Sequence, residues 1–241
     1  MVGGNVPRLN VDCQWGMNGL RAVARGNAVV IVDVLSFSTA TTVAVSRGAE
    51  ILPCDWNDEH AAALAYAERA EVASKRGRGK FSLAPASLKK IEKGTRLVLP
   101  SPNGSTLSFA ARELDAEAVL IGCFRNAAAV ARWASKQAHD VAVIAAGERW
   151  DDGTIRFAIE DWLGAGAIIS RIAGNRSAEA ESAAASFERL RHGIHATLSS
   201  CPSGRELITA GYREDIDIAS QLDVDGAVPL LSGNAFTLAT L

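Results

Sequence analysis

The chain has 241 residues, and 25 Lys and Arg against 27 Asp and Glu give a formal net charge of −2. Hydrophobic residues make up 48% and charged residues 22%, which excludes intrinsic disorder, and the lack of a basic excess argues against a nucleic-acid binder. No stretch approaches the ~18–20 continuous apolar residues of a membrane span, and the N-terminus lacks the basic and apolar regions of a signal peptide. We therefore expect a cytoplasmic protein that binds neither nucleic acid nor membrane.

Short apolar runs predict buried β-strands at 28–34, 50–53, 96–99, 118–121 and 141–145. These runs are apolar throughout rather than alternating, as expected for strands covered on both faces. Helical patterns lie between and after them, at 39–47, 58–75, 106–114, 126–137 and 159–172. The alternation of strand and helix predicts a single α/β domain over residues 1–241 with a mostly parallel sheet.

Residues 76–93 differ from the rest because they are rich in Gly, Lys, Arg, Ser and Pro and have no clean period. We expect an extended surface loop with a short helix near 88–92, and loops of this length are often functional. After Gly174 the composition predicts helix to about residue 198, followed by a helix capped by Ser203 and stopped by Gly211. The four cysteines form no C-x-x-C pair, so we expect reduced thiols and no structural zinc.

Polar residues follow the first strong strand, where Asp33 ends the run AVVIVD. Ligands of open α/β sheets bind outside the carboxyl ends of strands, and a carboxylate there is costly unless it is paired, capping or metal-bound. The hydroxyls of Ser38 and Thr39 stand at the start of the next helix, where backbone N–H groups attract anions. The alternative is that Asp33 only caps this helix.

Two further strand ends carry similar groups. Asn103, Gly104 and Ser105 follow the strand at 96–99 in a tight turn that can present backbone N–H groups. Arg125 and Asn126 follow the strand at 118–121; Arg125 could hold a phosphate or carboxylate, and Asn126 is otherwise a helix N-cap. An ordinary strand-to-helix turn is the alternative for each junction taken alone.

The strand at 141–145 leads into a polar loop and then a helix in which Glu160 and Asp161 interrupt an apolar run. Burying two carboxylates is costly, so a purely structural explanation, one N-cap and one surface charge, is the weaker alternative. Together with Asp33 they would supply the oxygen ligands that Mg²⁺ prefers.

Other catalytic motifs are missing. The chain has no Walker A, G-x-G-x-x-G or G-x-S-x-G sequence. A haloacid-dehalogenase phosphatase would need a second Asp at position 35, which is Leu35. The four histidines lie outside the strand ends, and His192 and His195 are expected to be a surface pair rather than metal ligands.

Taken in order, the four junctions resemble the 2-phosphosulfolactate phosphatase (ComB-like) family. The resembling segments are VVIVDVLSFSTATT, LVLPSPNGSTL, IGCFRNAAAVA, AAGERWDDGTIRFAIEDWLGAGAI and the tail SGRELITAGYREDIDIASQLDVDGAVPLL. The resemblance implies a three-layer α/β/α fold and Mg²⁺-dependent hydrolysis of a phosphate monoester, which is 2-phospho-3-sulfolactate in the best-known members. Two departures stand out. Ser36 and Phe37 replace an Arg and an Ala, and SLAPASL replaces a loop that carries Gly-Asn-Ser-Pro.

The leading hypothesis is therefore a Mg²⁺-dependent phosphatase acting on a small anionic phosphomonoester. A homodimer is the expected assembly, because homodimers are the commonest oligomers of soluble proteins. Asp33, Glu160 and Asp161 would hold the metal and act in catalysis. The phosphate would be bound by Ser38, Thr39, Asn103, Gly104, Ser105 and Asn126, and Arg125 would face a second anionic group. The alternatives are an anion-binding protein without turnover, and a hydrolase that uses Cys123 as nucleophile with Asp33 and a Lys.

Overall fold

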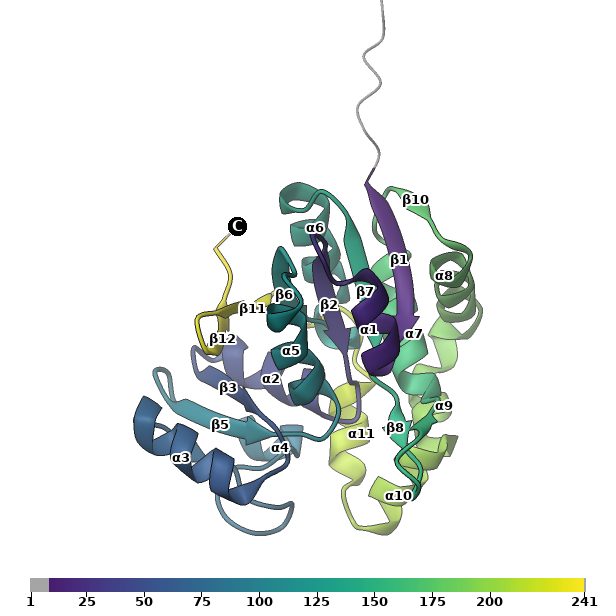
Figure 1. Cartoon of the computed structure of the whole chain (residues 1–241). Helices are drawn as coiled ribbons and strands as arrows, with labels where there is room; N and C mark the ends of the chain where they lie inside the picture. Colours follow the sequence, from purple (N-terminus) through teal and green to yellow (C-terminus); the bar gives the residue numbers. More distant parts are fainter. Residues whose placement is uncertain (1–8, 241) are drawn as a thin grey trace, which may run out of the picture.

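One half of the central sheet is entirely parallel. The computed structural model describes residues 9–240, so the first eight residues of the segment considered as a signal peptide lie outside it. In this half the strand order is β10 (Asn175–Arg176), β1 (Asn10–Trp15), β7 (Val141–Ala145), β2 (Ala28–Val32) and β6 (Ala118–Ile121). Figure 1 shows these strands side by side. The carboxyl ends of β2, β6 and β7 therefore lie at one edge.

The other half of the ten-stranded sheet contains β3 (Glu50–Cys54), β5 (Arg96–Pro100) and β4 (Glu71–Val72), again parallel to one another. The C-terminal hairpin of β11 (Pro229–Ser232) and β12 (Ala235–Leu238) joins the halves through antiparallel pairs to β6 and β3. Sheets twist from strand to strand, and Figure 1 shows β3 and β5 lying across the direction of β2. This twist brings the carboxyl end of β5 to the carboxyl end of β2.

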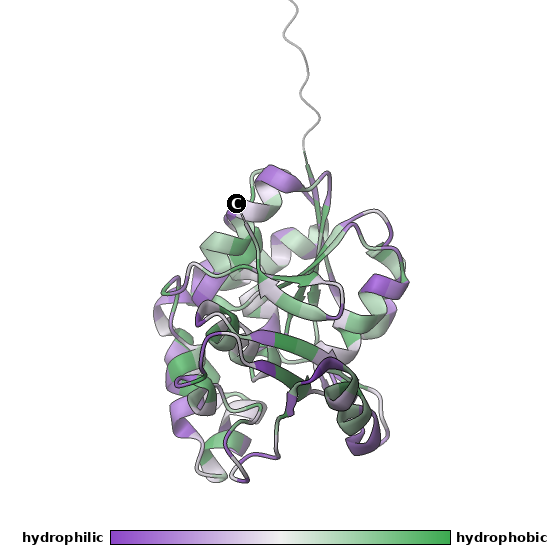
Figure 2. Ribbon diagram, turned by 90° about the vertical axis from the view of Figure 1, so that its left-hand side faces the viewer, coloured by the Kyte–Doolittle hydropathy of each residue, from purple (hydrophilic) through white to green (hydrophobic). Residues whose placement is uncertain are grey.

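Helices cover both faces of the sheet, which gives the predicted three-layer α/β/α fold. Along β2, Val30 and Val32 belong to one buried cluster with α6 (Ala127–Gln137), α7 (Ile159–Ile169) and α8 (Ala178–Leu190). Val29 and Ile31 belong to a second cluster with α1 (Gly16–Val23), α2 (Phe37–Ser46) and α5 (Gly104–Glu113). This alternation follows from the two-residue period of a strand. In Figure 2 the central strands are mostly hydrophobic and the outer helices carry most of the hydrophilic residues.

The remaining elements lie around this core. They are α3 (Asp58–Glu68), α4 (Pro85–Leu88), the 3-10 turns η1 (Phe124–Asn126) and η2 (Arg191–Gly193), the hairpin of β8 (Glu148–Arg149) and β9 (Ile155–Arg156), and the helices α9 (Ile194–Ser200), α10 (Pro202–Thr209) and α11 (Arg213–Ala219). No helix among residues 9–240 is long and apolar enough to cross a membrane.

The five predicted strands are all present, but several predicted boundaries are wrong. The helix expected over 58–75 ends at Glu68, because Arg69 adopts a left-handed conformation (φ 52°) and β4 follows. The short helix expected near 88–92 lies at Pro85–Leu88, with proline in its first turn. The cap of α10 is the Cys201 sulfur rather than Ser203.

Candidate active site

Asp33 is the residue directly after β2, and its carboxylate is almost fully buried. Its Oδ2 accepts a hydrogen bond from the Gly104 backbone N–H at 2.8 Å and from the Ser101 hydroxyl at 3.5 Å, and its Oδ1 accepts from Phe37 N at 3.3 Å. A Cβ on Gly104 would lie 2.8 Å from Asp33 Oδ2. The close approach of the two strand ends therefore requires glycine at this position.

Asp161 stands in the first turn of α7 and is 3% exposed. Its Oδ1 accepts from Val34 N at 2.7 Å and its Oδ2 from Gly147 N at 2.9 Å. These backbone groups follow β2 and β7, so one carboxylate ties both strand ends to α7. Asp161 thus sets the position of the adjacent Glu160.

Glu160 is 1% exposed, and its Oε2 has no hydrogen-bond partner among the residues that the structure describes. A buried, unpartnered carboxylate oxygen is costly. The charge of Glu160 contributes to raising the pKa of Asp33, Asp161 and Glu148. The site therefore contains more negative charge than its neighbouring cations and hydrogen-bond donors neutralise.

Glu148 is a site residue that the sequence analysis missed. It begins β8, just beyond β7, and its Oε2 accepts a hydrogen bond from Asn103 Nδ2 at 2.9 Å. Burial, followed by the charge of Asp33, raises the pKa of Glu148 to about 7. Its place three residues after Ala145, at a carboxyl strand end, was the signal that could have identified it.

Burial is also the main cause of the raised pKa values of Asp33 and Asp161. The charge of Glu160 contributes to both shifts, and the charge of Asp33 raises the pKa of Asp161 further. Hydrogen bonds from the backbone N–H groups of Gly104 and Phe37 oppose the shift of Asp33. Carboxylates at the ends of β2 and β7 and on α7 thus form one electrostatically coupled cluster.

A cavity of about 620 Å³ adjoins this cluster. Its lining includes the polar Asn103 and Glu148 and the apolar Trp15, Ile155 and Phe157. The rings of Trp15 and Phe157 meet edge to face with 5.0 Å between centroids. Glu148 is the member of the carboxylate cluster that lines this cavity, which is large enough for a small molecule.

Arg76 is the second residue that the sequence analysis missed. Its guanidinium comes from the loop between β4 and α4 and donates a hydrogen bond to the Ser36 hydroxyl and, at 3.3 Å, to Asp215 Oδ2. Burial raises the pKa of Asp33, and the positive charge of Arg76 offsets part of that rise. A guanidinium therefore reaches position 36 from a distant segment of the chain.

Four of the residues predicted to cradle phosphate are fully buried and hydrogen-bonded to the backbone. Ser38 Oγ accepts from Asp33 N and donates to Ile31 O, and the side chains of Thr39, Ser105 and Asn126 bond backbone groups at other loop and strand positions. These groups shape the strand ends. Asn103 and Gly104 are the predicted cradle residues that contact the carboxylate cluster.

Arg125, predicted to face a second anionic group, is turned toward α11 instead of standing free. It donates to the Ile218 carbonyl at 3.2 Å and to the Gln221 side chain, and its Nη2 lies 3.9 Å from Asp225 Oδ2. Cys123 is fully buried, and burial raises the pKa of its thiol. Both features disfavour a nucleophilic thiolate there.

The donor chemistry of the cluster suits a hard cation, because carboxylate oxygens are what Mg²⁺ prefers and Glu160 Oε2 lacks a partner. Within residues 9–240, however, no three or more His, Cys, Asp or Glu side chains stand close enough together to form a ready metal site. Asp161 already uses both oxygens on backbone N–H groups. A cation here would thus need movement of the less constrained side chains.

Comparisons with known proteins identify the family of this chain. The sequence profile of the family described as 2-phosphosulpholactate phosphatase matches residues 19–234. The chain is 30% identical over 206 residues to the 2-phosphosulfolactate phosphatase of Methanothermobacter thermautotrophicus, covering 83% of this chain and 85% of that protein. It is 31% identical over 214 residues to a protein of Carboxydothermus hydrogenoformans named as a probable 2-phosphosulfolactate phosphatase, covering 86% and 87%. The chain therefore belongs to the 2-phosphosulfolactate phosphatase family, whose members are phosphoric monoester hydrolases.

Proposed function

We propose that this protein hydrolyses a small anionic phosphate monoester to its alcohol and inorganic phosphate. The first candidate substrate is 2-phosphosulfolactate, the compound in the names of the relatives. The observation that carries the proposal is the coupled carboxylate cluster of Asp33, Glu148, Glu160 and Asp161 at the meeting point of three strand ends. Glu148 of this cluster lines a cavity of about 620 Å³.

We further propose that Mg²⁺ is held by Asp33, Glu160 and Asp161, directly or through water. Two observations support this assignment: the unpartnered Glu160 oxygen and the pKa values that the carboxylates raise in one another. A bound divalent cation would offset negative charge on the phosphoryl group.

Three other residues would contribute to binding and proton transfer. Arg76, held against Ser36, would add positive charge beside Asp33. Glu148, with a pKa of about 7, could give or take a proton near neutral pH. Asn103 would fix its orientation through the 2.9 Å hydrogen bond to Oε2. Hydrolysis needs one water and delivers one proton to the leaving alkoxide, which a group of this kind can supply.

The test is phosphate release from 2-phosphosulfolactate and a panel of small phosphomonoesters, with Mg²⁺ or with EDTA. We expect release that depends on Mg²⁺. Release that is insensitive to EDTA would remove the metal from the proposal. If no substrate is turned over but anionic ligands raise the melting temperature, the protein is a binding protein on the same fold.

A further inference from the structure

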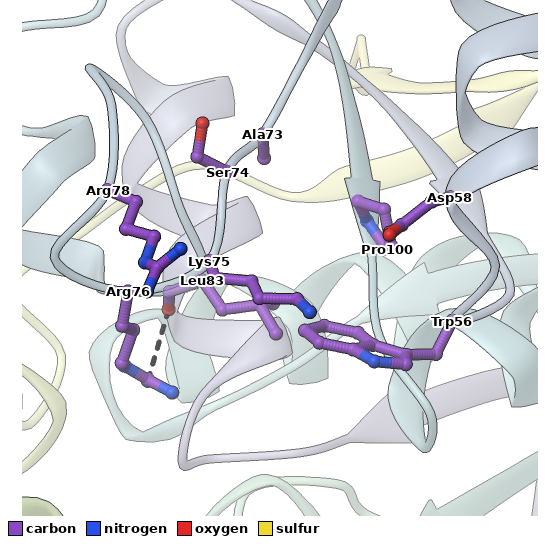
Figure 3. A pocket seen from close by; sticks show the side chains of 9 residues that line it. All are labelled: Trp56, Asp58, Ala73, Ser74, Lys75, Arg76, Arg78, Leu83 and Pro100. Carbon is purple, nitrogen blue, oxygen red and sulfur yellow. Dashed lines mark hydrogen bonds between the residues drawn. The ribbon is translucent and has the colours of Figure 1, made fainter.

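A second cavity, of about 320 Å³, lies beside the active site and is rich in positive charge. Figure 3 shows its wall, with Lys75 extending toward the Trp56 ring and Arg76 extending away from it toward the Leu83 backbone. The lining side chains include three cations, Lys75, Arg76 and Arg78, against one carboxylate, Asp58. Among the residues that the structure describes, Lys75 and Arg78 have no acidic partner within 4 Å, so their charges are available to a ligand.

The loop that carries these cations has a defined shape. Arg78 N donates to the Lys75 carbonyl at 2.9 Å, and Gly77, between them, has φ +74°, so residues 75–78 form a tight turn. Ser74 N donates to the Phe81 carbonyl at 2.8 Å and closes the loop behind the turn. Lys75 and Arg78 therefore stand at the two ends of one turn, with Cα atoms within about 7 Å of each other.

Arg76, at the second position of the turn, anchors it to the active site. Its guanidinium is bound by Asp215, which is 1% exposed, and by the Ser36 hydroxyl, and it lies 5.7 Å from the centroid of the Tyr212 ring. These contacts fix the turn, so the cost of ordering it is paid on folding rather than on binding. The two outer cations are thereby held ready for an anion.

Two of the residues that line the cavity connect it to the surroundings of Asp33. Pro100 lines the cavity, and the next residue, Ser101, places its hydroxyl 3.5 Å from Asp33 Oδ2. Arg76 also lines the cavity and contacts Ser36, three residues after Asp33. Residues that line the cavity are thus joined directly to residues that contact or adjoin Asp33.

We propose that this cavity binds a second anionic group of the substrate, a sulfonate or carboxylate, through Lys75 and Arg78. This inference rests on the proposed phosphatase function and adds to it a specificity site. The phosphoryl group stays with the carboxylate cluster, and the basic turn recognises the rest of the molecule.

The kinetic test uses two substrates that differ in one group, 2-phosphosulfolactate and 2-phospholactate, which lacks the sulfonate. Because a hydrogen bond to a charged group contributes roughly 1.5–3 kcal/mol, we expect Lys75→Ala and Arg78→Ala each to raise KM for 2-phosphosulfolactate about tenfold or more. The kcat should change little, and both constants for a tailless ester such as methyl phosphate should be unchanged. If the variants raise KM equally for esters with and without a second anionic group, the phosphoryl group itself lies in the cavity, and the proposal is overturned.

Lys80→Ala is the matched control, because Lys80 lies on the same loop, is exposed and does not line the cavity. If Lys80→Ala raises KM for 2-phosphosulfolactate as much as the other two variants do, the effect comes from the overall charge of the protein, and the proposal is overturned. Calorimetric binding of the product 3-sulfolactate, compared with lactate, gives a readout without turnover. We expect sulfolactate to bind more tightly, with the difference lost in Lys75→Ala, even if no phosphatase activity is found. Equal binding of the two compounds that weakens in Lys75→Ala would assign the cavity to the carboxylate. Binding of both compounds that is unchanged in Lys75→Ala would overturn the inference while leaving the phosphatase proposal standing.

Discussion

The backbone nitrogen of Gly104 lies 2.8 Å from Asp33 Oδ2, so helix α5 begins on the carboxylate that ends β2. These residues are 71 positions apart, and they follow β2 and β5, which belong to opposite halves of the sheet. The hydrogen bond therefore joins the two halves at the candidate active site. It also orients the Asp33 carboxylate, since the other oxygen accepts from Phe37 N.

Gly104→Ala is expected to damage both stability and activity. The added Cβ would lie 2.6 Å from Phe37 Cδ1 and 2.8 Å from Asp33 Oδ2, and overpacking of this kind costs about 1–3 kcal/mol. Activity should fall further than stability explains, because Asp33 must turn. Gly193→Ala is the control, since a Cβ there meets no atom within 4 Å. Thermal unfolding and phosphate release on both variants check this, and a fully active Gly104→Ala would contradict it.

Glu160→Gln is expected to lower activity without lowering stability. The substitution removes a buried charge whose Oε2 has no partner, so the metal-free variant should unfold at the same or a higher temperature than the natural protein. Phosphate release should fall about 100-fold or more, because a charged active-site group is lost. Glu59→Gln in the first turn of α3, where the side chain is exposed, should change neither property. A marked drop in the melting temperature of Glu160→Gln would assign Glu160 a structural role.

The folded state should lose stability as pH rises through the range where Glu148 titrates. Its pKa is about 7 in the folded protein against an ordinary value of 4.5, so the unfolded chain releases this proton first. Protonated Glu148 therefore contributes to the free energy of unfolding. This contribution is complete below about pH 4.5, is lost by about pH 7 and amounts to at most about 3 kcal/mol. Urea unfolding in EDTA at pH 5 and pH 8 measures it. Glu148→Gln should flatten the dependence, and an unchanged slope would show that other groups cause it.

Much of this site could be predicted because its residues follow strands. Asp33 stands directly beyond an apolar run, Asn103 lies in the turn that follows another, and Glu160 and Asp161 interrupt an apolar helix. The structure brings Asp33, Asn103 and Gly104 together as that pattern indicates. Arg125, which the pattern predicts to face a second anionic group, has its contacts with α11 instead.

Arg76 was missed because nothing local marks it. It is one of several cations in a loop without periodicity, and its importance comes from Ser36 and Asp215, which are 40 and 139 positions away. The insertion of β11 and β12 between β6 and β3 was missed for the same reason. Four-residue strands that pair through single registers leave a weak pattern in sequence, and tertiary contacts decide their place.

Asp215→Asn tests whether the C-terminal helix α11 holds the basic turn in place. Asp215 Oδ2 accepts from Arg76 Nε at 3.3 Å, and Oδ1 accepts from Ala86 N at 3.3 Å, so one buried carboxylate fixes both ends of the loop. Because Arg76 is partly exposed (22%), we expect a loss of about 1–3 kcal/mol, less than for a fully buried pair. The neighbouring Glu214→Gln, which breaks the exposed pair with Lys89, should cost less than about 0.5 kcal/mol. Asp215→Asn should also raise KM for a doubly anionic substrate, since Arg76 would no longer anchor Lys75 and Arg78. If Asp215→Asn unfolds like Glu214→Gln and keeps its KM, α11 does not support the loop.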